Sequence, residues 1–334
     1  MTDRKLRVGV YGASGYAGQD LVEILATHPN VEIVFATSNT YAGQPVPGTF
    51  LYYTKTDDAH MDGLDVVFLA VPHRTASPYA AKAIAAGCRV IDLSADMRLD
   101  TPESYEQWYG VKHPHPELLP TPYGLPEFNR EHLRGAQKVA VPGCYPTTTL
   151  LGLLPLLRAG VIAQEAPIIV DAKSGVSGAG RKIKDNLHFV EVFGNLSPYS
   201  PGRTHRHVGE IEQEMARFGY EGRLIFVPHL LPVDRGLMAS IYVTLNYHIT
   251  SDRVTALYHD CYDGEQLVDV LPVGEQASLK HVVRKNHAAI SLTAITQQYM
   301  HITSVTDNLR KGAAGQAVQC FNLMFDIPET TALL

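Results

Sequence analysis

The fold of this chain is decided by residues 6–25, which read LRVGVYGASGYAGQDLVEIL. The segment Leu6–Tyr11 predicts a strand, and the spacing of apolar residues after the loop predicts a helix. Between them, Gly12, Gly15 and Gly18 form a GxxGxxG loop. Glycine permits the tight turn, lets the backbone approach a pyrophosphate, and lets the helix pack on the strand. The stretch therefore predicts a dinucleotide-binding unit, although a glycine-rich turn without a ligand has the same pattern.

The following residues continue an alternation of strands and helices. Val31–Ala36 and the apolar run at residues 66–71 predict buried strands, and residues 89–94 predict another after a helix that Gly87 ends. Such alternation is typical of a doubly wound parallel sheet. Ligands of these sheets lie beyond the carboxyl ends of the strands. Polar residues at those ends are therefore candidate site residues.

The end of the second strand indicates which dinucleotide is bound. NAD-preferring folds carry an acidic residue there, which binds the ribose hydroxyls. This chain instead reads Thr37-Ser38-Asn39-Thr40. Hydroxyls and an amide are available to bind a ribose phosphate, and no carboxylate repels it. The segment favours NADP over NAD, with a simple polar loop as the alternative.

A second informative stretch reads VPGCYPT at residues 141–147. A helix is predicted to begin near Pro146, because the missing N–H of proline suits a first helical position. Six leucines between residues 150 and 157 predict that this helix is largely buried. Pro155 is expected to kink the helix or to end its regular part early.

Cys144 lies just ahead of this predicted helix start. The positive end of the helix dipole stabilises a thiolate, and the exposed backbone N–H groups can hold a developing oxyanion. We therefore interpret Cys144 as a nucleophile. A buried structural cysteine is the alternative interpretation.

The character of the sequence changes after this helix. Residues 168–172 and 240–245 predict strands separated by longer loops and few helices, which is typical of a largely antiparallel sheet. We expect an α/β protein, with a Rossmann-type doubly wound parallel sheet and an α+β catalytic domain. Residues 1–146 form the expected NADP-binding domain, completed by a C-terminal helix in 308–334. Residues 147–307 form the expected catalytic and oligomerisation domain.

Several polar residues at strand or helix ends are further candidates. Arg98 follows a strand and suits a phosphate or carboxylate, or it pairs with a nearby aspartate on the surface. The glycine-rich loop at residues 174–181 either wraps a substrate with backbone amides or is a flexible connection. In the segment HRHVGEI, a histidine near a helix start suits a general acid or base, although the chain has fifteen histidines.

Composition excludes several classes of protein. The chain has 334 residues, 45% of them hydrophobic, and a net charge of −6, which offers nothing to attract nucleic acid. Its four cysteines are scattered and form no CxxC pair, so neither a metal site nor a disulfide framework is predicted. We find no signal-like or membrane-spanning apolar run and expect a cytoplasmic protein.

Seven motifs stand in register between about residue 7 and residue 325: GASGYAG, DLSADMR, YGLPE, VPGCYPT, SGVSGAGR, HRHVGEI and DNLRKGAAGQAVQ. Together they resemble the N-acetyl-gamma-glutamyl-phosphate reductase family of arginine biosynthesis, which is similar in fold and chemistry to aspartate-semialdehyde dehydrogenase. The resemblance implies that Cys144 attacks an acyl phosphate, that NADPH reduces the resulting thioester, and that a semialdehyde is released. It also implies that His207 is the acid–base partner.

The resemblance places the cofactor on the glycine loop, with the ribose phosphate near Ser38, and makes Asn308 and the last glycines the nicotinamide-side wall. The expected cofactor-binding residues are Gly12, Ser14, Gly15, Tyr16, Gly18, Ser38, Ser177, Gly178, Asn308 and Gly312. The expected substrate-binding residues are Arg98, Ser174, Arg181, His205 and Arg235.

Two other functions fit the same residues. One is the related reductase of lysine biosynthesis, which acts on an aminoadipyl phosphate attached to a small acidic carrier protein. The other is a non-catalytic NADP-binding sensor. A homodimer or homotetramer that associates through the second-domain sheet is expected, with a small acyl phosphate as the substrate.

Overall fold

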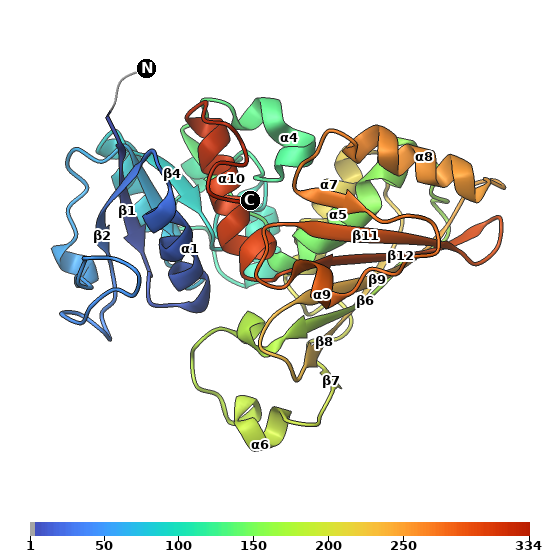
Figure 1. Cartoon of the computed structure of the whole chain (residues 1–334), viewed down its shortest axis with the longest axis horizontal. Helices are drawn as coiled ribbons and strands as arrows, with labels where there is room; N and C mark the ends of the chain where they lie inside the picture. The colour runs from blue at the N-terminus through green and yellow to red at the C-terminus, as the bar shows by residue number, and fades with distance from the viewer. Residues whose placement is uncertain (1–3) are drawn as a thin grey trace. The chain divides into compact units, whose positions relative to one another are not determined.

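The computed structural model describes residues 4–334, which divide into two compact units (Figure 1). One unit holds the chain up to Gly143 together with Ala313–Leu334, and the other is Cys144–Gly312. These boundaries lie a few residues from the expected ones at 146 and 308. Residues 1–3, which the expected first domain includes, lie outside the described residues.

The first unit is built on a five-stranded sheet in the order β2-β1-β3-β4-β5. All four strand pairs are parallel, which confirms the predicted sheet. The four residues of β3 are fully buried because helices cover both faces of such a sheet. The strands are β1 (Leu6–Tyr11), β2 (Val31–Ala36), β3 (Val66–Leu69), β4 (Arg89–Asp92) and β5 (Lys138–Ala140).

The helices of the first unit include one from the far end of the chain. This helix, α10, packs against α1, α4 and β4, and all ten of its residues are buried. Its Asn322 Oδ1 lies 2.9 Å from Nε2 of His28, and Gln316 Nε2 donates to the carbonyl of Gly124 at 2.7 Å. The helices are α1 (Tyr16–Thr27), α2 (Ala76–Ala85), α3 (Pro102–Tyr109), α4 (Pro126–Leu133) and α10 (Gly315–Met324), with short turns η1 (Thr56–Asp58) and η2 (Pro116–Leu118).

The second unit is built on a seven-stranded sheet in the order β10-β11-β12-β9-β6-β8-β7. Its pairs are antiparallel except β10–β11 and β6–β8, as the predicted largely antiparallel sheet requires. The strands are β6 (Ile168–Gly175), β7 (Ser197–Pro198), β8 (Leu224–Leu231), β9 (Leu237–Thr244), β10 (Val268–Val270), β11 (Ala288–Ala294) and β12 (Tyr299–Thr306).

The helices α5, α7 and α8 lie on one face of this second sheet, whereas α9 packs on the other face, against β11 and β12. The central helix α5 packs against β9, β12, α7 and α8 (Figure 1). No helix within residues 4–334 is long and apolar enough to cross a bilayer. The helices are α5 (Cys144–Arg158), α6 (Phe189–Val192), α7 (His207–Arg217), α8 (Ser251–Tyr262) and α9 (Leu279–Val282), with turns η3 (Val176–Ala179) and η4 (Asp185–Leu187) and a π-helix η5 (Arg310–Ala314).

The helix α5 corrects two expectations. It begins at Cys144 rather than near Pro146, and it continues through Pro155 to Arg158 instead of ending its regular part early. A proline cannot donate to the carbonyl four residues before it, which here is Leu151. The hydroxyl of Tyr262 donates to that carbonyl at 2.6 Å. Because α8 supplies the missing donor, the helix continues across its proline.

The other face of the second sheet carries exposed apolar side chains. Ile225, Ile169, Tyr242 and His301 stand opposite one another on four neighbouring strands. Buried and exposed residues alternate along β6, β8 and β9. The residues before and after Ile169, Ile225 and Tyr242 therefore point to the opposite face, which α5 covers. Ile169, Ile225 and Tyr242 keep 37–44% of their surface exposed. This face is called the open sheet face below.

Candidate functional site

The glycine loop of the first unit has the tight geometry that the sequence predicts. Gly12 has a φ of +75°, and a Cβ added there would lie 2.3 Å from the carbonyl oxygen of Ala70. A Cβ on Gly18 would lie 2.3 Å from the carbonyl oxygen of Gly12. The backbone N–H of Gly12 donates to Oγ1 of Thr37 at 3.0 Å, which ties the loop to the end of β2. Gly15 precedes α1 and has no side chain, which leaves that end of the helix suited to a phosphate.

We predict that Gly12→Ala destabilises the protein by about 3 kcal/mol or more, because it combines a left-handed φ with a backbone clash. Gly43→Ala is a matched control, since Gly43 has a φ of +80° but open space around its Cβ position. Strain alone at Gly43 should cost only about 1–2 kcal/mol. Urea unfolding of both variants measures the difference. Equal losses of stability would contradict the close approach at Gly12.

Two of the predicted cofactor-binding serines lie together. Oγ of Ser14, in the glycine loop, donates to Oγ of Ser38 at 2.8 Å. Ser38 follows β2, is 5% exposed, and also accepts the backbone N–H of Tyr41 at 3.1 Å. Tyr16, at the first position of α1, keeps 38% of its surface exposed. The loop and the end of β2 therefore form one polar region in which the residue types can take a ribose phosphate.

Arg98 lies buried beside the end of the parallel sheet. Its Nε donates to the carbonyl of Val141 at 2.8 Å, and Nη2 donates to that of Leu93 at 2.9 Å. Nearby, Asp92 is fully buried and accepts both the N–H and the hydroxyl of Ser94. Burial, and then the charge of Asp96, raises the pKa of Asp92 to about 7. The two carbonyls fix the plane of the Arg98 guanidinium, whose role in substrate binding stays a prediction.

In the second unit, Cys144 is the first residue of α5, so its sulfur lies where the helix dipole stabilises a thiolate. Its carbonyl accepts the Thr148 hydroxyl at 2.9 Å, and that hydroxyl lies 2.7 Å from Oγ1 of Thr306 on β12. A Cβ added to Gly312 would lie 3.0 Å from Cβ of Cys144. The predicted site residues Cys144 and Gly312 are therefore in direct contact. The absence of a side chain on Gly312 lets its backbone come close to Cys144.

The two predicted histidines stand beside the residue that follows Cys144. The ring of Tyr145 lies 5.8 Å from the ring of His205 and 6.0 Å from that of His207, and the two histidine rings are 4.8 Å apart. His207 begins α7, which packs against α5. The structure thus brings the predicted nucleophile's helix and the predicted acid–base residue together within one unit.

The two histidines differ in their surroundings. Desolvation by burial, and then the charge of Arg206, lowers the pKa of His205 to about 4. Nδ1 of His205 accepts the backbone N–H of His207 at 3.3 Å. His205 is therefore a neutral ring at physiological pH that orients the start of α7. The neighbouring Tyr145 hydroxyl donates to the carbonyl of His229 at 3.2 Å, and burial raises the pKa of Tyr145 far above its ordinary value.

The glycine-rich loop after β6 meets the residues that precede η5. Nδ2 of Asn308 donates to Oγ of Ser177 at 3.0 Å, and Oδ1 of Asn308 accepts the N–H of Gly236 at 2.7 Å. A Cβ on Gly178 would lie 2.8 Å from Oγ of Ser174. Asn308 therefore lies beside Ser174, Ser177 and Gly178, which precede it by about 130 residues in the sequence; their role in binding stays a prediction.

The two remaining arginines lie in different settings. Arg181 is exposed and follows Gly180, past the η3 turn. Nη1 of Arg235 lies 3.5 Å from Oδ2 of Asp307, a carboxylate with no exposed surface. Asp307 was not among the predicted site residues, although the motif beginning Asp307-Asn308 contains it. The spacing of a motif does not reveal which distant segments its carboxylate joins.

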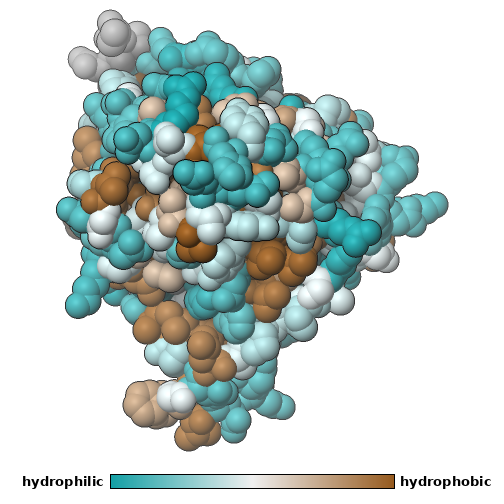
Figure 2. Space-filling model, turned by 90° about the vertical axis from the view of Figure 1, so that its right-hand side faces the viewer, coloured by the Kyte–Doolittle hydropathy of each residue, from teal (hydrophilic) through white to brown (hydrophobic). Residues whose placement is uncertain are grey.

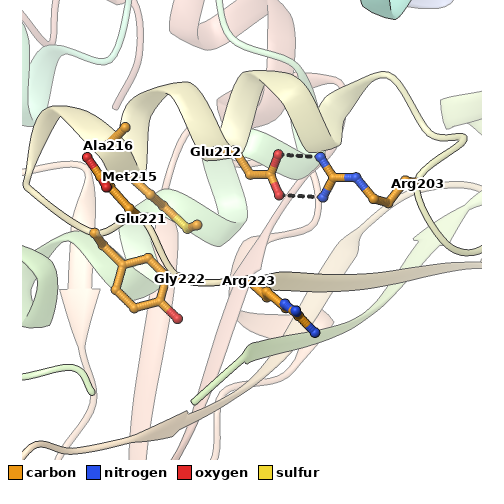
Figure 3. Close-up of a pocket in the computed structure, with 8 residues that line it drawn as sticks. Arg203, Glu212, Met215, Ala216, Glu221, Gly222 and Arg223 are labelled. Atoms are coloured by element: carbon orange, nitrogen blue, oxygen red, sulfur yellow. Dashed lines mark hydrogen bonds and ion pairs between the residues drawn. The ribbon is translucent and has the colours of Figure 1, made fainter. Parts of the chain in front are cut away.

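A cavity of about 340 Å³ in the second unit lies elsewhere, along α7 (Figure 3). Arg203 and Glu212 form a two-pronged ion pair at its edge, with N–O distances of 2.6 and 2.8 Å. This pair joins the segment that precedes His205 to α7. The cavity contains none of the predicted site residues and is lined by Arg203, Glu212, Met215, Ala216, Tyr220, Glu221, Gly222 and Arg223.

Comparison with known proteins finds a family match for each of the two units. Residues 7–136 match the semialdehyde dehydrogenase NAD-binding domain, and residues 144–308 match the semialdehyde dehydrogenase dimerisation domain. The chain is 44% identical to an N-acetyl-gamma-glutamyl-phosphate reductase of Moorella thermoacetica, over an alignment of 340 positions that covers 98% of each protein. It is also 44% identical to the reductase of that name from Symbiobacterium thermophilum, over 98% of this chain and 97% of that protein.

Solved structures show the same fold at lower identity. Aspartate semialdehyde dehydrogenase II from Vibrio cholerae superposes with a TM-score of 0.77 and 19% identity, over 97% of this chain and 99% of that one. Aspartate semialdehyde dehydrogenase from Candida albicans, solved with NADP, gives a TM-score of 0.70 and 15% identity, over 96% and 98% of the two chains. The two-unit architecture is therefore shared with these enzymes.

Proposed function

Because this chain belongs to the N-acetyl-gamma-glutamyl-phosphate reductase family, we propose that it reduces N-acetyl-L-glutamyl 5-phosphate to N-acetyl-L-glutamate 5-semialdehyde and phosphate in arginine biosynthesis. One observation carries the proposal most strongly. Cys144 begins the buried helix α5, and the next residue contacts the ring of His207 within the same unit. A thioester-forming reductase requires a thiol at a helix start and an imidazole close to it, and both residue types occur in this part of the second unit.

The first step uses the thiol. The imidazole of His207 takes the proton from Sγ of Cys144, and the thiolate attacks the acyl carbon of the acyl phosphate. A C–S bond forms, the C–O bond to phosphate breaks, and inorganic phosphate leaves and takes up one proton from water. Since the acyl phosphate is already activated, this step needs no metal ion. The backbone N–H groups at the start of α5 suit the negative charge that develops on the carbonyl oxygen.

NADPH, when bound, supplies the hydride that reduces the thioester. His207 then gives its proton to the oxygen that was the carbonyl, which yields a hemithioacetal on Cys144. When this species collapses, His207 takes that proton back, the C–S bond breaks and the semialdehyde leaves. The same imidazole finally returns the proton to Sγ, so the residues end each cycle in their starting state.

We assign the acid–base role to His207 rather than His205 because the surroundings of His205 do not suit proton transfer at neutral pH. The low pKa of His205, about 4, keeps it neutral throughout the physiological range. Its Nδ1 is also engaged by the backbone N–H of His207. His205 therefore suits the positioning of α7, or a contact to the substrate through its other nitrogen, better than repeated proton transfer.

The residues of the first unit fit NADPH. Gly12 and Gly18 have no room for a Cβ, and a loop with such bare backbone suits the close approach of a pyrophosphate. Ser14 and Ser38 place two hydroxyls at the end of β2, where NAD-preferring folds carry a carboxylate. We propose that Ser38 lies against the ribose phosphate, and that Asn308 and Gly312 face the nicotinamide.

For the substrate we propose Arg235, Arg181 and Ser174 as ligands of its anionic and polar groups. Arg235 and Ser174 lie on segments joined through Asn308 and Gly236, and Arg181 follows on the same loop as Ser174. A guanidinium holds carboxylates and phosphates with paired hydrogen bonds. Arg98 remains a candidate for the phosphate group, with its guanidinium plane set by two carbonyls.

The experiment that tests the function runs the reaction backwards. N-acetyl-L-glutamate 5-semialdehyde, phosphate and NADP are mixed with the protein, and reduced nicotinamide is followed by its absorbance. We expect absorbance to rise with NADP much faster than with NAD. No rise with either cofactor would favour the sensor. A rise only with the carrier-bound aminoadipate semialdehyde would favour the reductase of lysine biosynthesis.

We also propose that the second unit joins two copies of the chain, as a homodimer or as a dimer within a homotetramer. The open sheet face offers the row Ile225, Ile169, Tyr242 and His301. The segment around α6, residues 181–196, projects from this unit, and hydrophobic groups gather on the lower part of the surface in Figure 2. Large exposed apolar patches of this kind are typical of association surfaces. Cys144 is in no disulfide, and a thiol that must react as a nucleophile fits a reducing compartment such as the cytoplasm.

We predict that Phe189→Glu combined with Phe193→Glu converts the oligomer into smaller species. These stacked rings are 5.0 Å apart and keep 73% and 69% of their surface exposed. Two buried carboxylates at an interface would lack partners. Sedimentation velocity measures the change, and Phe50→Glu is the control because Phe50 is exposed on the first unit. An unchanged sedimentation coefficient would remove the segment around α6 from the interface.

A further inference from the structure

Asp307 follows β12 and has no exposed surface. Its carboxylate accepts four donors from three segments. Oδ1 accepts the N–H groups of Leu309 at 2.9 Å and Arg310 at 3.1 Å. Oδ2 accepts the N–H of Arg284 at 2.6 Å and lies 3.5 Å from Nη1 of Arg235. A buried carboxylate is costly unless it is paired and hydrogen-bonded, and here Arg235 supplies the opposite charge.

The first of these segments touches the nucleophile. The carbonyl oxygen of Asp307 accepts the N–H of Gly312 at 2.9 Å, which closes a wide turn from residue 307 to residue 312. Gly312 packs against Cys144, where an added Cβ would lie 3.0 Å from the cysteine Cβ. Oδ1 holds the beginning of the same turn. Asp307 therefore fixes, at both ends, the turn that packs on the residue carrying the reactive sulfur.

The second segment is the connection between β8 and β9. Its Arg235 side chain is only 10% exposed, and Oδ2 of Asp307 lies beside Nη1 of that side chain. The next residue, Gly236, donates to Asn308 and accepts the N–H of Gly175 at 2.8 Å. The backbone of Arg235 is held as well, because a Cβ on Gly175 would lie 2.7 Å from its Cα. The backbone of Arg235 and its Nη1 are thus both constrained, and these contacts limit the orientation of the guanidinium.

We propose that Asp307 is a positioning residue, which orients Arg235 toward the anionic group of the substrate and holds the 307–312 turn against Cys144. This inference rests on the proposed function. A guanidinium holds carboxylates and phosphates through a planar set of N–H groups, so a carboxylate beside one Nη helps to set the plane in which those groups are offered. Removing the charge of Asp307 while keeping its shape should therefore act on substrate binding through Arg235.

The test compares Asp307→Asn, Arg235→Lys and the double variant with the wild-type enzyme. Asp307→Asn keeps the size of the side chain and one oxygen acceptor but removes the charge that faces Arg235. We expect the KM for the acyl substrate to rise by about 10- to 100-fold, with a smaller change in kcat. Because Asp307 acts through Arg235, the double variant should lose little more than either single variant. Asp269→Asn removes an exposed carboxylate on β10 that pairs with His287, and it should leave KM unchanged.

A second measurement follows the rate at which iodoacetamide alkylates Cys144 at fixed pH. Asp307→Asn should change this rate severalfold, and Asp269→Asn should not. Unchanged KM in Asp307→Asn, or losses that multiply in the double variant, would overturn the inference. Circular dichroism shows whether Asp307→Asn folds. If it does not fold, the KM of Arg235→Lys is the deciding measurement. An unchanged KM in that variant would also overturn the inference. A folded wild type without reductase activity contradicts the proposed function instead, and the alkylation rates then decide the role of Asp307.

Discussion

Replacing Cys144 with alanine is expected to lower kcat for the reduction by a factor of about 10⁴ or more. Alanine keeps the start of α5, since that helix is held by buried leucines and by the donors from α8. It removes the only atom on that residue that can form a bond to the acyl carbon. Alanine cannot capture the acyl group, so by the proposed mechanism neither the thioester nor the semialdehyde should form. Steady-state assays in both directions measure the loss.

The control for this variant is Cys261→Ala, which changes a partly buried cysteine on α8 of the same unit. It should keep wild-type activity, and both variants should bind NADP with similar affinity by calorimetry. Mass spectrometry of the wild type mixed with substrate, without NADPH, should find the acyl group on Cys144. If Cys144→Ala keeps appreciable turnover, the thioester mechanism is wrong, whichever substrate the enzyme uses.

Replacing His207 with glutamine is expected to lower kcat by about 10²- to 10³-fold, because the side chain can still form hydrogen bonds but cannot move a proton. His205→Asn is the matched comparison. The asparagine Oδ1 occupies nearly the place of Nδ1 and can still accept the N–H of His207, which His205 does in the wild type at 3.3 Å. We expect this variant to lose less than about tenfold, since it keeps the contact that orients α7.

The pH dependence of kcat distinguishes the two histidines further. The limb of the profile that depends on the acid–base residue should vanish in His207→Gln and persist in His205→Asn. The pKa of His205, about 4, already places its titration outside the usual assay range. A larger loss in His205→Asn than in His207→Gln would exchange the roles of the two residues.

Much of the fold could be predicted because its signals are local. The strand, glycine loop and helix of residues 6–25 occur in the structure as β1, the Gly12 turn and α1. The buried run of β3 and the exposed alternation of β6 also follow from which residues are apolar. In each case the pattern of neighbouring residues decides the outcome. The same reasoning found the polar end of β2 and the helix that follows Gly143.

Other features depend on contacts that no local pattern contains. α5 continues past Pro155 because Tyr262, on another helix, donates to the carbonyl of Leu151. The four donors to the Asp307 carboxylate include two that come from residues 235 and 284. The low pKa of His205 results from burial by rings of separate segments, among them Tyr145 and Phe226. Long-range packing, rather than spacing, sets these properties.

The last long helix of the chain has a consequence for biosynthesis on the ribosome. α10 supplies buried contacts to α1, α4 and β4, including the pair of Asn322 with His28. The unit that precedes Gly143 is therefore incomplete until residues 315–324 have been translated, whereas the intervening unit is continuous in the sequence. Domains generally fold as units during synthesis. During synthesis, the first unit therefore keeps an apolar surface uncovered until α10 is available. The second unit, which contains Cys144, can already reach its native state before then.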